Sequence, residues 1–542
     1  MTPSFILLVT LVQFGLVAAN SDPRVILQQG TLKGKFLKSY VGGKTIFAFQ
    51  SIPYAAPPVG VLRFQPPQDA PTWSGERLAQ SSAPTCPQVS FFTGNFEGQE
   101  DCFVDQKGLN VMFWLHGGGF FAGSGNPDMF GPEFLLDHDV ILVTVNYRLG
   151  PLGFLSLNSR GVTGNYGLKD QVAALRWVRD NIANFGGNPN SVTVFGESAG
   201  AASVHFLMMS PLAKGLFHRA IVQSGSAFND WAFERQPERL AADLVARMGC
   251  DCRNESLMMA CLRASNAQTL AERSTAIMTE NNLPRVFAPI MEPVGTEGAF
   301  LSADPSSPVS LGQIRMNDVP LMAGVMTHEA IYHLIGLGDK NPEEELQKNR
   351  EHYVPEILGI NVNSSKFEEI WREIRDFYDK LYPDDPLEKF VILNSDVEIV
   401  FGVDELVRVL ASSSSQQVFY YQFSYDGGRS TIKSRANISY NGTCHEDELA
   451  YLFTGSAYPS LLKASSQDFL MIARLSKMWT DFAKTGNPTP STNSGFGTQW
   501  KPVDKLKTRY LDIGVQLVMR DENMNEARVY FWRELVRKHR QN

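Results

Sequence analysis

The chain has 542 residues, 43% of them hydrophobic and 20% charged, and its formal net charge is −8 at pH 7. A nucleic-acid partner is excluded because phosphate binding needs a concentrated basic surface, which these counts do not supply. No linker, internal repeat or low-complexity tract divides the chain, so we expect one large domain over residues 20–542.

The first apolar stretch of the chain covers residues 5–19. It ends in Val17-Ala18-Ala19, small residues of the kind that signal peptidase accepts. It is shorter than the roughly 20 apolar residues of a transmembrane helix, and the polar C-terminal end carries neither a retention signal nor the tail of a lipid anchor. The sequence therefore predicts a signal peptide over residues 1–19 and a secreted, extracellular protein without a membrane anchor.

Two kinds of strand pattern follow. Between residues 25 and 51, apolar and polar residues alternate, which is typical of short antiparallel strands. Continuous apolar runs then suit strands of a parallel sheet that helices cover on both faces; they lie at 111–115, 140–145, 192–195 and 220–222. Amphipathic helical spacing between them, at 172–185, indicates an α/β core. The C-terminal half is mostly helical by pattern, for example over 367–381 and 468–485.

A candidate nucleophile lies between a buried strand and a helix. Residues 196–200 read Gly-Glu-Ser-Ala-Gly, directly after the run at 192–195 and before a helix-forming stretch. A strand-to-helix turn of this kind strains the serine backbone and lifts its hydroxyl out of the sheet. We therefore predict that Ser198 is the nucleophile of an acyl-transfer reaction.

A glycine-rich segment supplies the second part of such a site. His116 is followed by three glycines, directly after the strand predicted at 111–115. Backbone amides there could stabilise the oxyanion that forms on a substrate carbonyl, and Gly118, Gly119 and Ala199 are the candidates. A phosphate cradle is disfavoured because no Lys-Ser or Lys-Thr follows the glycines.

Several motifs together resemble the type-B carboxylesterases and cholinesterases, with the secreted esterases of insects most similar. They are residues 185–187 continued through 196–200, Asn-Tyr-Arg-Leu-Gly at 146–150, Asn-Tyr-Gly-Leu-Lys-Asp-Gln at 165–171, and Gln-Ser-Gly-Ser at 223–226. The resemblance implies the α/β-hydrolase fold, a mostly parallel central sheet flanked by helices, with helical insertions in the C-terminal half. It also implies an acyl-enzyme mechanism on a small or medium carboxylic ester, with no cofactor and no metal.

The acid and the base of the site must both follow Ser198, because the chain order in α/β-hydrolases is serine, acid, histidine. His445 lies in Gly-Thr-Cys-His-Glu-Asp-Glu-Leu, which resembles the family's loop with the catalytic histidine; His333 is the nearest rival. Glu329 follows the apolar run at 320–325, similar to the family's acid loop. It would accept the imidazole Nδ1 proton and stabilise the imidazolium. Glu292 is the alternative acid.

Two neighbouring side chains receive lesser roles. Glu197 directly precedes the nucleophile, but nothing in its position indicates that it transfers a proton during catalysis. Ser224 would at most contact the catalytic side chains without touching the substrate. The resemblance also implies two structural ion pairs, Arg63 with Glu100 and Arg148 with Asp170.

Cysteines and sequons agree with an oxidising compartment. Two close pairs stand out, Cys86 with Cys102 and either Cys250 or Cys252 with Cys261. The family's spacing favours Cys250 with Cys261, and a zinc site is disfavoured because companion histidines are missing. Possible glycosylation sites occur at Asn254, Asn363, Asn437 and Asn441.

The sequence restricts the range of physiological esters only by excluding some classes. Choline recognition calls for an aromatic face, often a tryptophan, and the loop from Cys86 to Cys102 holds three phenylalanines but no tryptophan. Juvenile-hormone esterases usually carry Gln at the position of Glu197, so the resemblance favours a general or detoxifying carboxylesterase, with a hormone or odorant ester left open. An inactive adhesion module of the same fold and a lipase are the competing functions. The sequence gives no indication of the oligomeric state.

One interval departs from the family pattern. Only fourteen positions separate Cys102 from His116, about a dozen fewer than the resemblance leads us to expect, enough for one strand and its turn. We therefore expect one early strand of the main sheet to be missing. A neighbouring strand would then present an exposed edge that invites aggregation.

Overall fold

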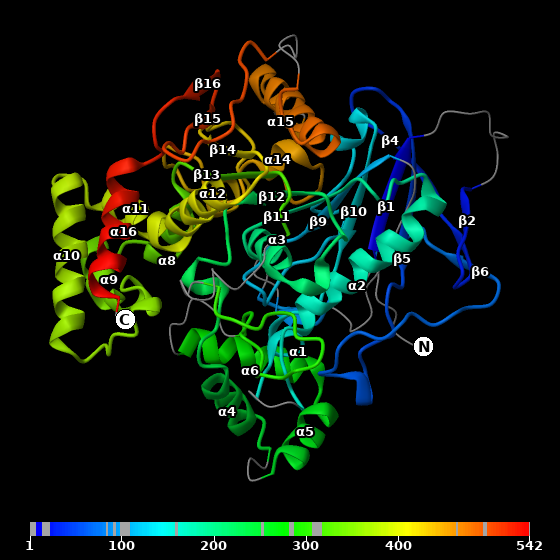
Figure 1. Cartoon of the computed structure of the whole chain (residues 1–542), viewed down its shortest axis with the longest axis horizontal. Helices are drawn as coiled ribbons and strands as arrows, with labels where there is room; N and C mark the ends of the chain where they lie inside the picture. Colours follow the sequence, from blue (N-terminus) through cyan, green and yellow to red (C-terminus); the bar gives the residue numbers. More distant parts are fainter. Residues whose placement is uncertain are drawn as a thin grey trace.

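A computed structural model of the chain describes residues 7–12 (backbone only), 22–82, 85–89, 94–97, 109–157, 161–250, 254–280, 287–305, 317–461, 464–490 and 496–540. Its central feature is one twisted sheet that crosses the molecule, with helices on both sides (Figure 1). The strand order is β16-β15-β14-β13-β12-β11-β9-β10-β1-β5-β4.

Seven neighbouring strands of this sheet are parallel, as the continuous apolar runs predict. They are β10 (Val140–Val145), β9 (Asn110–Leu115), β11 (Val192–Glu197), β12 (Arg219–Gln223), β13 (Leu321–Met326), β14 (Val418–Phe423) and β15 (Tyr510–Ile513). Antiparallel strands flank them: β16 (Leu517–Arg520) on one side, and β1 (Leu7–Val12), β5 (Thr45–Ile52) and β4 (Lys35–Lys38) on the other. The expected α/β-hydrolase architecture is thus present.

Alternate side chains of each parallel strand enter two different cores. Phe113 of β9 packs on the side covered by α2 (Tyr166–Asn181) and α3 (Ala199–Met209), whereas Trp114 packs on the side covered by α15 (Ser466–Thr485). Both side chains are completely buried. Burial on both faces explains why these strands read as unbroken apolar runs rather than as alternating patterns.

The C-terminal half adds a helical region with its own apolar core. In Figure 1 its helices gather on one side of the molecule, next to the C-terminal helix. The region contains α8 (His333–Leu337), α9 (Pro342–Lys348), α10 (Ser365–Leu381), α11 (Pro386–Ser395), α12 (Phe401–Ser413) and α16 (Glu526–His539). The other α-helices within the described residues are α1 (Gly150–Phe154), α4 (Pro237–Arg247), α5 (Glu255–Ala264), α6 (Ala267–Glu280), α13 (Thr431–Ala436) and α14 (Leu449–Leu452).

Short strands near the N-terminus confirm the antiparallel pattern predicted for residues 25–51. β2 (Arg24–Ile26) pairs with β3 (Thr31–Lys33), and β4 pairs with β5. β6 (Glu76–Leu78) completes a small three-stranded sheet, and β7 (Gln88–Val89) pairs with β8 (Phe96–Glu97).

The N-terminal segment has an unexpected place. Strand β1 lies between β10 and β5 and is antiparallel to both, with Leu7 opposite Val145 on one side and opposite Ile52 on the other. The exposed edge expected from the short interval after Cys102 is therefore absent at β10, because residues 7–12 occupy that position. The expectation was wrong on this point because a six-residue apolar segment suits a buried strand as well as a signal peptide.

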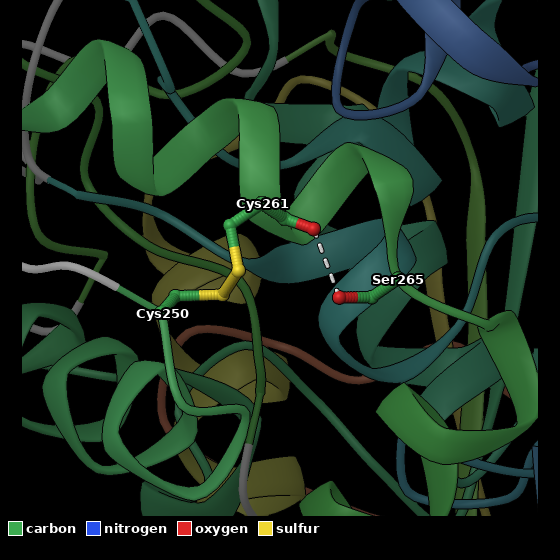
Figure 2. The surroundings of a disulfide bond; sticks show 3 residues. All are labelled: Cys250, Cys261 and Ser265. Carbon is green, nitrogen blue, oxygen red and sulfur yellow. Dashed lines mark hydrogen bonds between the residues drawn. A yellow bond between two sulfur atoms is a disulfide. The ribbon is translucent and has the colours of Figure 1, made fainter.

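A disulfide joins Cys250 to Cys261, the pairing that the resemblance implies (Figure 2). It connects the end of α4 to α5, and the Ser265 hydroxyl donates to the Cys261 carbonyl at 2.9 Å. Cys86 is a buried, free cysteine, so the expected Cys86 to Cys102 bridge is wrong: Cys86 packs in the apolar core instead of forming a disulfide, and Cys102 and Cys252 lie outside the described residues.

Two further expectations concern the surface and the ion pairs. All four sequon asparagines are exposed, which is compatible with glycosylation at each. Arg148 and Asp170 form a buried ion pair at 2.7 Å, as the resemblance implies, whereas Glu100 lies outside the described residues. Within the described part of the chain, no helix is both long and apolar enough to cross a membrane.

Candidate active site

The predicted nucleophile lies at a sharp turn between β11 and α3. Ser198 has φ 56° and ψ −122°, a strained backbone conformation for a residue with a side chain, and its N–H donates to the Gln223 carbonyl at 2.9 Å. A β-carbon at Gly200 would lie 1.9 Å from the Leu115 carbonyl oxygen, so only glycine fits there. The turn leaves Ser198 partly exposed while its neighbours are buried.

The glycine loop at the end of β9 adjoins this turn. A β-carbon on Gly117 would lie 3.0 Å from Cβ of Ser198, so the two segments are in direct contact. Gly118 has φ 104°, and a side chain there would collide with the Ala122 carbonyl oxygen at 2.1 Å. The structure therefore places the loop that carries Gly118 and Gly119 against the Ser198 turn through Gly117, on backbone that remains partly exposed.

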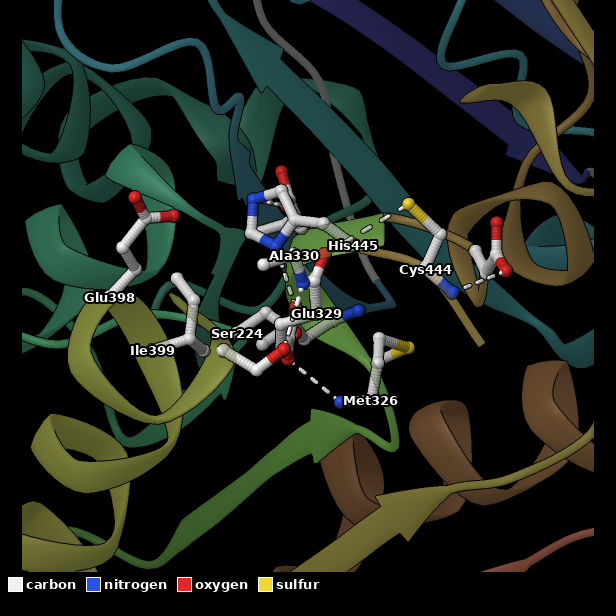
Figure 3. Close-up of polar contacts among 12 residues, drawn as sticks. Ser224, Met326, Glu329, Ala330, Glu398, Ile399, Cys444 and His445 are labelled. Atoms are coloured by element: carbon white, nitrogen blue, oxygen red, sulfur yellow. Dashed lines mark hydrogen bonds and ion pairs between the residues drawn. The ribbon is translucent and has the colours of Figure 1, made fainter. Parts of the chain in front are cut away.

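The predicted acid and base meet beyond the end of β13. Oε2 of Glu329 lies 2.7 Å from Nδ1 of His445, and Oε1 accepts hydrogen bonds from the Ser224 hydroxyl at 2.6 Å and the Met326 N–H at 2.7 Å (Figure 3). Glu329 is completely buried. Because a carboxylate accepts, Nδ1 must carry the proton, and this leaves Nε2 as the nitrogen that can exchange one.

Backbone contacts hold the two loops together. His445 N–H donates to the Glu329 carbonyl at 3.0 Å, and His328 N–H donates to the Thr443 carbonyl at 3.0 Å. The Thr443 hydroxyl in turn donates to the carbonyl of Phe423, the last residue of β14, at 2.6 Å. The imidazole position is thus fixed by the ends of β13 and β14.

The other nitrogen of His445 faces a second carboxylate. Nε2 lies 2.9 Å from Oε1 of Glu197, and no hydrogen bond joins it to Ser198 within the described part of the chain. Burial alone would lower the pKa of His445, but the charges of Glu197 and Glu329 outweigh burial and hold that pKa well above its usual value. The resting site therefore favours an imidazolium between two carboxylates.

More carboxyl groups lie around Glu197. Burial raises the pKa of Glu446 and of Glu448 to about 8 each, and the charge of Glu197 adds to both shifts. Glu448 accepts a hydrogen bond from the Gln223 side chain at 2.8 Å. A site with this many buried carboxyl groups resists further negative charge near neutral pH.

The rival residues are engaged elsewhere. Glu292 is buried and pairs with Lys169 at 3.0 Å, and Asn165 also donates to it at 3.1 Å. Nε2 of His333 lies 2.9 Å from Oε1 of Glu398. Neither rival therefore has the contact with its partner that the triad requires.

Ser224, expected at most to support the site, donates to Glu329. Two contacts of the site escaped prediction. They are Glu197 with His445, and the ring of Tyr332, whose centroid lies 5.8 Å from that of His445. Only the last had a sequence signal: Tyr332 follows Glu329 by three residues, a spacing that places two side chains on one face of a 3₁₀ turn.

One group of side chains with the spacing of metal ligands lies on the surface helices, away from the elements that carry Ser198. Among the residues that the structure describes, Glu369, Glu373 and His539 form the one group whose atoms could hold a metal ion. They lie on α10 and α16, where Lys538 already pairs with Glu373 at 2.5 Å.

Comparisons with known proteins agree with this geometry. The model of the carboxylesterase family matches residues 21–532. The chain belongs to the carboxylesterase family. This carboxylesterase is 34% identical to Esterase E4 of Myzus persicae, over 90% of each chain, and 33% identical to Venom carboxylesterase-6 of Apis mellifera, over 95% of this chain and 94% of that protein.

A solved structure extends the likeness to three dimensions. The juvenile hormone esterase of Manduca sexta, solved with OTFP covalently attached, superposes with a TM-score of 0.85 at 28% identity and covers 95% of this chain and all of its own. The carboxylesterase therefore has the α/β-hydrolase fold, and it is a carboxylic ester hydrolase.

Proposed function

We propose that the carboxylesterase hydrolyses its esters through an acyl-enzyme on Ser198, with His445 as general base and Glu329 as the acid of the triad. The observation that carries this proposal is the 2.7 Å contact between Nδ1 of His445 and the buried Glu329, on loops that end beside the nucleophile turn. The chain order serine, acid, histidine is that of α/β-hydrolases.

In each step of the proposed reaction, one proton moves to or from His445. Ser198 Oγ attacks the ester carbonyl while Nε2 of His445 takes the hydroxyl proton, and the oxyanion accepts hydrogen bonds from Gly118, Gly119 and Ala199 N–H. The intermediate collapses when Nε2 gives its proton to the leaving alcohol. Water then repeats both steps on the acyl-enzyme and releases the carboxylic acid. Glu329 stabilises the imidazolium throughout.

Glu197 sets the condition for the first step. Nε2 of His445 lies 2.9 Å from Glu197, so the imidazole must lose its proton and move toward Ser198 before it can act as a base. Catalytic hydrogen bonds commonly tighten only when substrate is bound. The contact thus holds a resting state that an incoming ester replaces.

For the substrate we propose small or medium carboxylic esters of the detoxification, hormone or odorant type. Phe121, Trp231 and Tyr332 are partly exposed aromatic side chains near the glycine loop and His445, which suits apolar ester arms. A lipase is the alternative. Turnover of short aryl esters compared with long-chain triglyceride separates the two.

We also propose a secreted glycoprotein, with glycans on the exposed sequons. Removal of residues 1–19 would take β1 out of the sheet. A secreted enzyme cleaved at that point would lack β1, whereas one that keeps residues 1–19 would keep the described sheet, and the N-terminal sequence of the secreted enzyme decides between the two.

Replacement of the nucleophile tests the mechanism. Ser198→Ala should lower the turnover of an aryl acetate by about 10⁴-fold or more, because the histidine then has no nucleophile to activate. Ser224→Ala is the matched control: it removes only a hydroxyl that donates to Glu329, and should cost about tenfold. Near-equal activities of the two variants, with unchanged melting temperatures, would overturn the assignment of Ser198.

A further inference from the structure

A second buried carboxylate lies close to the site. Glu398 belongs to η9 (Asp396–Val400), a π turn between α11 and α12, and its side chain is 9% exposed. Nε2 of His333 and Nε2 of His352 both lie 2.9 Å from its Oε1, and the Tyr332 hydroxyl donates to its Oε2. Single π turns inside helices are rare and occur often at functional sites.

Tyr332 connects this carboxylate to the catalytic histidine. It is the last residue of η6 (Glu329–Tyr332), and residues three apart in a 3₁₀ turn share one face. The Tyr332 ring accordingly lies 5.8 Å from the His445 ring between centroids, at an angle of 52°. Figure 3 shows Glu398 and Ile399 on the helix beside the Glu329 and His445 pair. Tyr332 thus forms a wall beside the imidazole.

The same turn holds a second aromatic wall. The backbone carbonyl of Glu398 accepts a hydrogen bond from Nε1 of Trp231 at 2.6 Å. The Trp231 ring lies 6.3 Å from the ring of Phe120, which directly follows the glycine loop. One turn therefore fixes two partly exposed rings, Tyr332 on the side of His445 and Trp231 on the side of the oxyanion hole.

Electrostatics strengthen the hydrogen bond between the Tyr332 hydroxyl and Glu398. Burial would raise the pKa of Glu398, but His333 and His352 outweigh burial and hold that pKa well below its usual value. Burial and the charge of Glu398 raise the pKa of Tyr332 well above 10. The phenol therefore stays protonated and donates to an anionic acceptor, which is a stronger hydrogen bond than one between neutral groups.

We propose that Glu398 is a positioning residue whose side chain sets Tyr332 as a rigid wall for a flat, unsaturated alcohol arm of the ester. The proposal rests on the proposed function, because His445 gives its proton to the leaving alcohol and so places that arm beside Tyr332. Aromatic faces at fixed angles favour flat rings, in offset or edge-to-face contact, over puckered rings of the same size.

Two matched esters test the proposal. Benzyl acetate and cyclohexylmethyl acetate share the acyl group and have alcohols of similar leaving ability, but only benzyl is flat. The wild-type enzyme should prefer benzyl acetate. Glu398→Leu should reduce the ratio of the two kcat/KM values roughly five-fold, mainly through KM for benzyl acetate. Glu398→Gln, which keeps an acceptor for the Tyr332 hydroxyl, should retain most of the ratio.

A double-mutant cycle shows whether Glu398 acts through Tyr332. Tyr332→Leu should lower the ratio as Glu398→Leu does, and the double variant should lower it no further, because both changes remove the same wall. Glu388→Gln is the control: Glu388 also pairs with a histidine, His328, and accepts from a phenol, Tyr440, yet neither ring has a recorded contact with His445 among the described residues. It should leave the ratio unchanged.

Three results would overturn the proposal: an unchanged ratio in Tyr332→Leu, an equal fall in Glu388→Gln, or fully additive effects in the double variant. If Glu398→Leu does not fold, Tyr332→Phe decides: it removes only the hydroxyl that donates to Glu398 and should lower the ratio, and an unchanged ratio would overturn the proposal. If the wild-type enzyme hydrolyses neither ester, that result contradicts the proposed function instead.

Discussion

The middle of the sheet and the region near one of its ends are assembled in different ways. At β11, β12 and β13 the candidate site is built by short segments that directly follow their strands: the turn at Ser198, Ser224, and the loop that carries Glu329. At β10, β1 and β5 the sheet depends on a strand from the start of the chain, which pairs with β5 and also with β10, more than a hundred positions away. Local geometry defines the first region, whereas long-range pairing defines the second.

The two regions should therefore respond differently to substitution. A substitution among the residues that follow β11, β12 or β13 should remove chemistry and leave the fold, because the strands themselves are buried and paired on both sides. A change in β1 should act on the fold first, because β10 and β5 have no contact with each other's backbone in the described sheet except through β1.

The largest effect is expected at the acid of the site. Glu329→Gln should lower kcat by about 10³- to 10⁴-fold with little change in melting temperature, because Gln cannot stabilise the imidazolium and favours the wrong tautomer. Glu292→Gln is the matched control, since Glu292 is equally buried but pairs with Lys169. It should lower stability and spare kcat in the folded fraction. A larger loss of kcat in Glu292→Gln would show that the acid is misassigned.

Proline in β1 tests the other region. Val9→Pro should reduce the yield of soluble enzyme about tenfold or more, because proline removes a backbone donor from a strand paired on both sides, opposite Val143 and Phe49. The yield and the N-terminal sequence of the purified enzyme are the measurements.

Val294→Pro is the control for that change. Val294 is exposed and follows Pro293 in a turn closed by the Thr296 N–H, a position that proline favours. It should leave the yield unchanged. An active enzyme that begins after residue 19 would contradict a role for β1 in the mature fold.

A smaller effect, on the pH dependence of catalysis, tests the electrostatics of the site. Glu197→Gln removes a negative charge 2.9 Å from Nε2, so the pKa of His445 should fall. The base works as neutral imidazole, and the acid limb of the kcat/KM profile should therefore move to lower pH, by roughly one unit. The stability that the raised pKa of His445 provides is present below about pH 6.5 and lost as pH rises through the folded value. An unmoved acid limb would contradict the contact.

The sequence predicted most of the first region and little of the second. Apolar runs located β9 to β13, and the glycines around Ser198 located the turn, because each depends on neighbours in the chain. Glu197 lies 248 positions before His445, and no local pattern reports that they meet. Likewise, the composition of residues 7–12 fits a signal peptide and a buried strand equally, and only the pairing distinguishes them. The Glu398 cluster was missed because its members come from three helical segments that meet only in the fold.

Covalent labelling tests the central claim most directly. An organophosphate should add one group per molecule, and peptide mapping by mass spectrometry should place it on Ser198. Ser198→Ala should take up no label, and Glu329→Gln should react at least a hundred-fold more slowly than wild type, because the histidine is less able to activate the hydroxyl. A label on another residue, or none on the folded wild-type enzyme, would contradict the assignment of Ser198 as the nucleophile.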